Sequence, residues 1–507
     1  MKRRWFALLL ALAAGLVVSP PVSLRAGDAE IVRSPVVTGV SRTGDGLRLE
    51  WIGNAGGRFQ LEAAESLGDA AGQFAPISPE LEGFRFVDTR AFARQRYYRV
   101  VDLTLKKPFE TASGRVPRAE AQLQDGELAA LASGNSDFAL AFYRQLAQDP
   151  GLAGANLFAS PYSISLAFAM TYAGAGGDTA AEMAGALGFD LPPERVHEAF
   201  NGLAKELAGR GAGIADPADR FQLNIVNETW GQTGYTFLGA YLDTLARHYG
   251  AAMNLLDFRA DAAAARIVIN DWVEKQTNDR IQDLMPDGSV TADTRLVLTN
   301  AIYFKAKWQD PFGKDRTATR PFTLASGAEA PVDTMTNRWN YPVAKGSGYT
   351  AVELPYKGEE LSMIVIAPDA GQFDAFERNL TAAQVSAVAG KLRATDVELS
   401  LPKFQFATTV PLKAVMTELG MRKAFSAGEA DFSGISAQDD LYIQSAIHKA
   451  FVAVDEEGTE AAAATGISVG VTSLPEPIRI DRPFVFLIRD RQTGTILFLG
   501  RVMNPGG

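Results

Sequence analysis

Ser468 is the side chain whose neighbours most resemble a catalytic pattern. It lies at the centre of residues 466–470, which match the G-x-S-x-G turn that presents a serine nucleophile between a strand and a helix. The two prolines within residues 471–477 prevent a helix there, and no histidine follows His448. A lone histidine in an apolar run is typical of a hydrogen-bonded core residue. These residues argue against a serine hydrolase, which is the least favoured function.

Composition excludes several other kinds of chemistry. The chain of 507 residues has no cysteine, so disulfides, thiolate metal sites and a cysteine nucleophile are excluded. No two of the three histidines, His197, His248 and His448, have metal-ligand spacing, so we expect no metal and no cofactor. With 49 basic and 59 acidic residues the net charge is -10, which argues against a nucleic-acid partner.

The N-terminus has the pattern of an export signal. Lys2, Arg3 and Arg4 precede the apolar run 5–18, and small and polar residues follow up to Ala26. We predict a signal peptide over residues 1–26 and a secreted or periplasmic protein without a membrane partner after cleavage. The alternative is an uncleaved anchor.

Two kinds of periodicity divide the remaining chain. Residues 35–104 contain short alternating segments separated by glycine turns, which predict a β-sandwich similar to a fibronectin type III module. Residues 105–126 show no period and are interpreted as a linker. From residue 127 to 506, helices and strands mix without a βαβ rhythm, so we expect an α+β domain. Its clearest expected elements are a helix opened by Ser160-Pro161, a helix over 262–284, a strand over 296–308 and a hairpin of 484–488 with 495–502.

Residues 455–482 are the most unusual stretch of this domain. An acidic start is followed by small residues and then by a proline-rich end, as in an exposed loop. The same segment also fits a strand, because its residues alternate in character. One face would carry Thr459, Ala461, Ala463, Thr465 and Ile467, and the other Glu460, Ala462, Ala464, Gly466 and Ser468.

Residues 127–506 resemble a serpin. Five segments resemble motifs of that family and occur in its order: 156–164, 298–308, 447–450, 455–461 and 478–484. The resemblance implies the serpin fold, with a large central β-sheet, further sheets and about nine helices. It also implies a suicide inhibitor of serine proteases rather than an enzyme. In this mechanism the protease cleaves a reactive loop, and the loop then inserts as a strand into the large sheet and traps the covalent acyl-enzyme.

The resemblance also assigns roles to residues. The hinge of the loop is formed by Glu456, Gly458, Thr459, Ala461, Ala462, Ala463 and Ala464. Its inward positions are small, which favours the inhibitory type over the alternative, a non-inhibitory serpin-fold binding protein. Counting from Gly458 places the reactive bond at Thr472–Ser473, with Val471 and Val469 as alternatives. Ser160, Ser163, Asn300 and His448 match a hydrogen-bonded cluster where the sheet opens, and Trp308 matches a tryptophan near the top of that opening.

The partners follow from the loop composition. No Lys, Arg or aromatic residue lies between Glu457 and Arg479, so we expect elastase-like or subtilisin-like proteases as targets. Residues 178–187, which match the helix used by glycosaminoglycan-activated members, contain no Lys or Arg, so no glycosaminoglycan site is expected. We expect a monomer.

Overall fold

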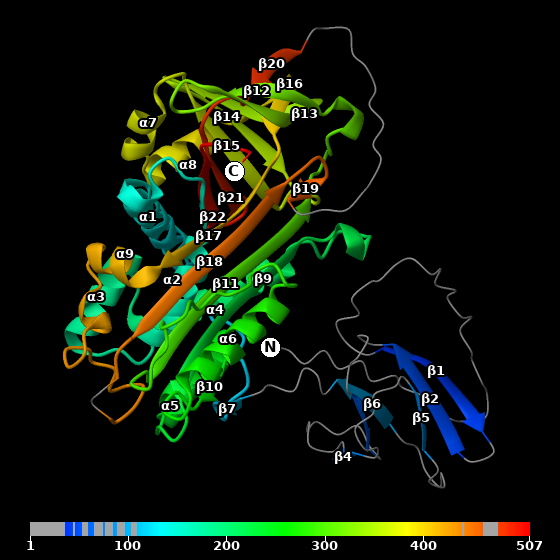
Figure 1. Ribbon diagram of the computed structural model, residues 1–507, viewed down its shortest axis with the longest axis vertical. Helices are drawn as coiled ribbons and strands as arrows, with labels where there is room; N and C mark the ends of the chain where they lie inside the picture. Colours follow the sequence, from blue (N-terminus) through cyan, green and yellow to red (C-terminus); the bar gives the residue numbers. More distant parts are fainter. Residues whose placement is uncertain are drawn as a thin grey trace. The chain divides into compact units, whose positions relative to one another are not determined.

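The computed structural model describes residues 109–438, 441–459 and 475–506, and the backbone of six strands within residues 36–102 (Figure 1). The chain divides into two compact units, 1–108 and 109–507. The predicted signal peptide lies outside the described residues. No helix among the described residues is long and apolar enough to cross a membrane.

The six strands of the first unit lie within residues 35–104. They form two antiparallel three-stranded sheets, β1-β2-β5 and β4-β3-β6. Their bounds are Val36–Thr43 (β1), Gly46–Ile52 (β2), Phe59–Ala64 (β3), Ala75–Pro76 (β4), Arg85–Asp88 (β5) and Tyr97–Asp102 (β6). A sandwich of the fibronectin type III kind stays a prediction.

The second unit mixes helices with two large sheets, as the α+β prediction requires. Within its described residues it has nine α-helices, and α5 continues into a π-helical turn over Leu245–Tyr249. The helices are Glu127–Gln148 (α1), Pro161–Tyr172 (α2), Gly177–Leu187 (α3), Pro193–Gly209 (α4), Gly239–Thr244 (α5), Ala262–Gln276 (α6), Phe373–Asn379 (α7), Ala382–Lys391 (α8) and Leu412–Glu418 (α9).

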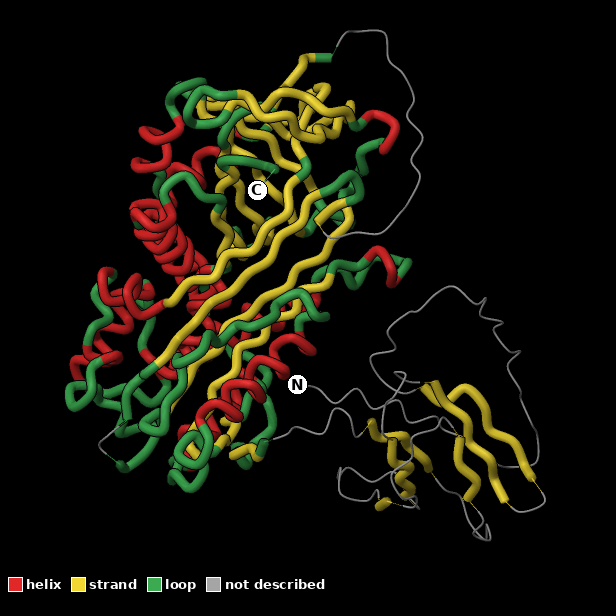
Figure 2. Tube along the Cα trace, viewed as in Figure 1, coloured by secondary structure: helices red, strands yellow, loops and turns green. Residues whose placement is uncertain are grey.

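The seven-stranded sheet is the long diagonal layer of Figure 2 and has the order β17-β18-β19-β11-β9-β10-β7. Its strands are Phe404–Pro411 (β17), Ser445–Val454 (β18), Gly458–Thr459 (β19), Leu296–Lys307 (β11), Gln222–Gln232 (β9), Met253–Leu256 (β10) and Glu110–Ala112 (β7). Its two central long strands, β11 and β18, run parallel, whereas β11 and β9 are antiparallel.

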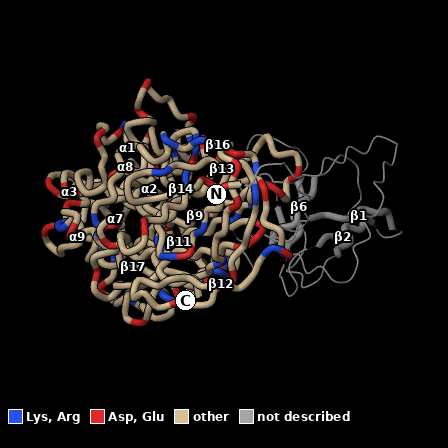
Figure 3. The backbone as a smooth tube through the Cα atoms, turned by 90° about the horizontal axis from the view of Figure 1, so that it is seen from above, with Lys and Arg blue, Asp and Glu red and all other residues tan. Residues whose placement is uncertain are grey.

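The nine-stranded sheet packs with α1 and α2 around the larger hydrophobic core. Its path is β20-β16-β13-β14-β15-β21-β22-β8, and β12 pairs with β13 beside it. The strands are Leu157–Ala159 (β8), Ala318–Thr323 (β12), Glu329–Gly346 (β13), Tyr349–Pro355 (β14), Leu361–Pro368 (β15), Arg393–Pro402 (β16), Glu476–Arg479 (β20), Phe484–Asp490 (β21) and Ile496–Val502 (β22). In Figure 3, basic and acidic positions are interspersed over the described part of the unit.

Strand β11 is buried on both faces because a separate hydrophobic core covers each of them. Leu298 and Ile302 belong to the larger core, whereas Val297 and Ala301 belong to a smaller core beneath α6. Alternating side chains of one strand point to opposite faces, so this division follows from the strand period. The continuous apolar run of the sequence is thereby explained.

Two boundaries differ from the sequence-based expectation. The helix expected over 262–284 ends at Gln276, because Asn278 and Asp279 adopt left-handed backbone angles that stop it. Within the expected linker 105–126, Glu110–Ala112 forms β7, and the Ala119 N–H donates to the Arg247 carbonyl at 2.9 Å. A three-residue strand is too short to give a periodic signal.

Candidate functional site

The join between β11 and β18, called the seam below, closes at its lower end and parts at its upper end. Six parallel residue pairs hold it closed, from Val297 with Ser445 to Ile302 with Ala450. Above them the two strands separate, and the two residues of β19 lie between them in antiparallel register. The upper seam therefore already accepts the first residues of the predicted loop (Figure 1).

Gly458 is required by the close approach of β19 to β11. A Cβ atom on Gly458 would lie 2.0 Å from the carbonyl oxygen of Ala306, which no side chain could tolerate. Thr459 follows it, pairs with Ala306 on one side and Val454 on the other, and is only 1% exposed. The first residues of the expected hinge therefore lie inside the sheet in the intact chain.

Aromatic rings cover the inserted threonine. The hydroxyls of Thr459 and Tyr356 are hydrogen bonded at 2.8 Å, and burial raises the pKa of Tyr356. Trp308 stacks on Tyr356 with ring centroids 4.7 Å apart and donates from Nε1 to the carbonyl of Asp455 at 3.0 Å. Trp308 thus lies at the upper end of the seam, against the chain that leads into β19.

Two ion pairs hold the chain just before β19. The ammonium of Lys403 lies 2.9 Å from Glu456, and that of Lys314 lies 2.7 Å from Glu457. Burial raises the pKa of Glu456, but hydrogen bonds from Lys403 and Thr317 outweigh it, so the net pKa is lowered. The start of the segment read as an exposed loop is therefore buried: Glu456 and Glu457 are 6% and 4% exposed.

A polar cluster lies at the closed part of the seam. His448 and Asn300 face each other across it, and Asn300 Nδ2 donates to the Ser163 hydroxyl at 2.8 Å. His448 Nε2 accepts from the backbone N–H of Ser160 at 3.1 Å, so Nδ1 carries the proton donated to Asn300 Oδ1. Ser160 caps α2 and donates to the carbonyl of Leu497 at 2.7 Å.

This cluster is structural in its chemistry. Burial lowers the pKa of His448 to about 3, so the imidazole is neutral, and both of its nitrogens are already hydrogen bonded. Ser468 lies outside the described part of the chain. Within the described residues, no group of three His, Cys, Asp or Glu side chains is placed to hold a metal ion.

Sequence reasoning missed four participants. Asn227 accepts from the Ser163 hydroxyl at 3.0 Å, and no motif around it in the sequence indicated this contact. Tyr356, Lys403 and Lys314 carried no local signal, since their partners lie far away in the chain. Ala461–Ala464 and the expected reactive bond at Thr472–Ser473 lie outside the described residues.

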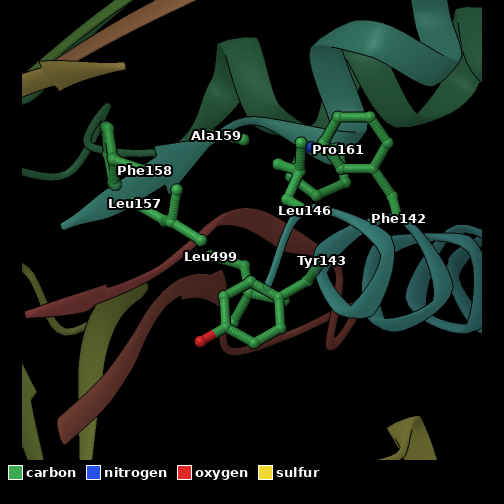
Figure 4. Close-up of a pocket in the computed structure, with 8 residues that line it drawn as sticks. All are labelled: Phe142, Tyr143, Leu146, Leu157, Phe158, Ala159, Pro161 and Leu499. Atoms are coloured by element: carbon green, nitrogen blue, oxygen red, sulfur yellow. The ribbon is translucent and has the colours of Figure 1, made fainter. Parts of the chain in front are cut away.

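A small hollow elsewhere in this unit does not form a ligand site. It leaves almost no space for a bound molecule, and its lining is almost wholly apolar (Figure 4). The Tyr143 hydroxyl, the one polar side-chain group of the labelled set, is hydrogen bonded to Glu377. The lining residues are Phe142, Tyr143, Leu146, Leu157, Phe158, Ala159, Pro161 and Leu499. The seam therefore remains the candidate site.

Comparisons with known proteins agree with this geometry. The family model described as "Serpin (serine protease inhibitor)" matches residues 133–505. Human leukocyte elastase inhibitor is 37% identical over 386 residues, covering 74% of this chain and 99% of that protein. An uncharacterized serpin-like protein of Thermococcus kodakarensis is 37% identical over 388 residues, covering 76% and 88%.

Solved structures show the same fold. The native thermophilic serpin tengpin aligns with a TM-score of 0.68 at 26% identity, covering 78% of this chain and all of that one. Human thyroxine-binding globulin, solved with thyroxine, aligns with a TM-score of 0.67 at 31% identity, covering 75% and 99%. The chain therefore belongs to the serpin family, with residues 133–505 forming its serpin domain.

Proposed function

We propose that this protein inhibits serine proteases by inserting its cleaved reactive loop into the seam of the seven-stranded sheet. The single observation that carries the proposal is the position of Gly458 and Thr459 between the two strands. The rest of the loop would continue along the same path and would separate the six residue pairs of the lower seam as it enters. We also propose that the protein is secreted or periplasmic and that it is a monomer.

Extending the observed register supports this proposal. Thr459 is opposite Ala306 and Val454, so each further loop residue meets the next pair down the seam. The inward loop residues would then lie between residues of similar polarity. Thr465 would reach the polar cluster, and Ile467 would lie between two apolar residues. The expected pairs are Ala461 with Phe304 and Val452, Ala463 with Ile302 and Ala450, Thr465 with Asn300 and His448, and Ile467 with Leu298 and Ala446.

Insertion would be favourable because the inserted strand would pair with both β11 and β18, so one strand interface of six pairs would be replaced by two longer ones. Backbone hydrogen bonds contribute about 1 kcal/mol each, and burial of apolar side chains adds to them. From Thr459 to Thr472 the inserted strand would span about 45 Å at roughly 3.3 Å per residue. A protease bound covalently near Thr472 would be carried the length of the sheet.

We propose elastase-like or subtilisin-like proteases as the targets. The loop offers Val469, Val471 and Thr472 near the expected bond, which suit a small, shallow specificity pocket. One relative at 37% identity is named as a leukocyte elastase inhibitor.

The test is incubation of the full chain with a panel of elastase, subtilisin, trypsin and chymotrypsin, followed by denaturing gels. A covalent band at the summed mass with elastase or subtilisin supports the proposal. Loop cleavage by every protease without such a band would overturn it and favour a non-inhibitory binding protein. A band that forms faster with trypsin than with elastase would overturn the target class alone.

A further inference from the structure

The smaller hydrophobic core spans the lower seam. Helix α6 and the chain that follows it, residues 262–290, cover this core on the side away from the sheet. We call residues 262–290 the α6 layer. The sheet contributes Val297 and Ala301 on β11 and Ile447 on β18 to the same core. Ile447 pairs with Thr299, so these apolar side chains of the two strands meet directly beneath the layer.

A full-length inserted strand would separate the β11 residues of this core from Ile447 on β18, an inference that rests on the proposed function. Neighbouring strands lie about 4.8 Å apart, so a new strand would move Ile447 away from Val297 by about that distance. In the extended register Ala464, Gly466 and Ser468 would enter the gap and face the α6 layer. The layer must loosen while these residues pass beneath it.

Phe109 packs beside the α6 layer, against the smaller core. Its ring meets the edge of Trp230 on β9 at a centroid distance of 4.7 Å and that of Trp272 on α6 at 5.3 Å. Trp230 is fully buried and donates from Nε1 to the Thr299 hydroxyl at 2.9 Å, which ties the rings to the seam. Phe109, Trp230 and Trp272 form what we call the aromatic brace.

The brace is fixed in place by an added edge strand. Directly after Phe109, β7 pairs with β10 through Glu110 with Leu255, Thr111 with Asn254 and Ala112 with Met253. Figure 1 shows β7 at the edge of the sheet next to α6 and β10. Residues 109–112 precede the segment 133–505 that matches the family, so the ring is supplied by the chain that leads into the serpin domain.

We propose that Phe109 holds the α6 layer against the sheet and thereby sets the rate at which a strand enters the seam. The ring contacts both the layer and β9 in the native state. These contacts must weaken when the α6 layer moves away from the sheet. They therefore raise the activation free energy of strand insertion. Phe109 is a regulatory residue in this proposal and touches neither the loop nor the protease.

The test measures uptake of a labelled synthetic peptide with the sequence of residues 459–472 by the full chain. Phe109→Ala should take up the peptide about tenfold faster than the wild type, since aromatic pairs stabilise by roughly 0.5–1.5 kcal/mol each. Phe109→Leu keeps apolar bulk and should be about threefold faster; it decides the question if the alanine variant does not fold. Leu123→Ala is the matched control, because Leu123 lies in the same leading segment but contacts Gly202 on α4.

Urea unfolding separates a brace from a merely structural contact. Lower unfolding stability with an unchanged uptake rate in the Phe109 variants would overturn the proposal, as would equal acceleration in Leu123→Ala. Peptide uptake needs no protease, so a failure to trap any protease would refute the proposed function and leave this result standing. If neither the wild type nor the variants take up the peptide, the seam does not admit a strand and both proposals fall.

Discussion

Successive residues of the inserted loop would point to opposite faces of the sheet. The same substitution at two neighbouring positions should therefore block insertion at one and permit it at the other. In the extended register Ala461 points into the larger core between Phe304 and Val452, which are 2% and 1% exposed. An arginine at this position would have to bury an unpaired guanidinium, at a cost of roughly 3–5 kcal/mol. At about 1.4 kcal/mol per factor of ten, insertion should slow by about two to three orders of magnitude.

Glu460→Arg is the matched control. Residue 460 would point to the opposite face, beside Lys305 and Ala453, which are both partly exposed. There the guanidinium stays in water and insertion should proceed. The two variants add the same side chain one residue apart, so loop composition and flexibility are held nearly constant.

The assay is titration of elastase, with the moles of inhibitor consumed per mole of protease as the readout. Ala461→Arg should raise this ratio more than tenfold and produce cleaved inhibitor in place of the covalent complex. Glu460→Arg should stay within about twofold of the wild type. Equal effects of the two substitutions, or an unchanged ratio for Ala461→Arg, would refute the alternation on which the insertion path is based.

Three further predictions concern the intact domain. His448 is neutral when folded, with a pKa of about 3 against roughly 6.5 unfolded, so its contribution is complete above pH 6.5 and is lost as the pH falls toward 3. Between pH 7 and pH 5 the wild type should therefore lose about 2 kcal/mol more unfolding free energy than His448→Gln; equal losses in urea titrations would contradict this. Gly458→Ala should cost about 2–3 kcal/mol in urea unfolding, because its Cβ would collide with Ala306. Lys403→Met should cost about 1–2 kcal/mol by leaving Glu456 with fewer partners, and the loss should shrink in a Lys403→Met, Glu456→Gln double variant.

Local signals in the sequence predicted the elements that depend on neighbouring residues. Ser160 caps α2 and Pro161 occupies its first turn, as their types require. The apolar run from Leu296 forms β11 and ends within one residue of the expected boundary. The hairpin expected from 484–488 and 495–502 forms as β21 and β22. Each of these features depends on residues that are close together in the chain.

Features that depend on distant partners could not be found in this way. Asn227 joins the polar cluster through residues 64 and 73 positions away, so its sequence neighbours gave no sign of this role. Glu456 and Glu457 lie in an acidic run that is usually solvated, yet lysines from β16–β17 and the 308–317 connection pair with them. Phe109 lies in a stretch without period, and its role follows only from two tryptophans on β9 and α6.

The central claim is that the seam can hold a strand that the intact loop does not yet supply in full. Differential scanning calorimetry of intact chain and of chain nicked at a single bond near Thr472 tests it most directly. Nicking removes no residue, and an ordinary loop once cut leaves the melting temperature unchanged or lower, because the unfolded chain gains freedom. Insertion should instead raise the melting temperature of the serpin domain by at least about 10 °C, since five or more kcal/mol are gained at roughly 2–4 °C each. A nicked domain that melts at or below the intact one would contradict the account.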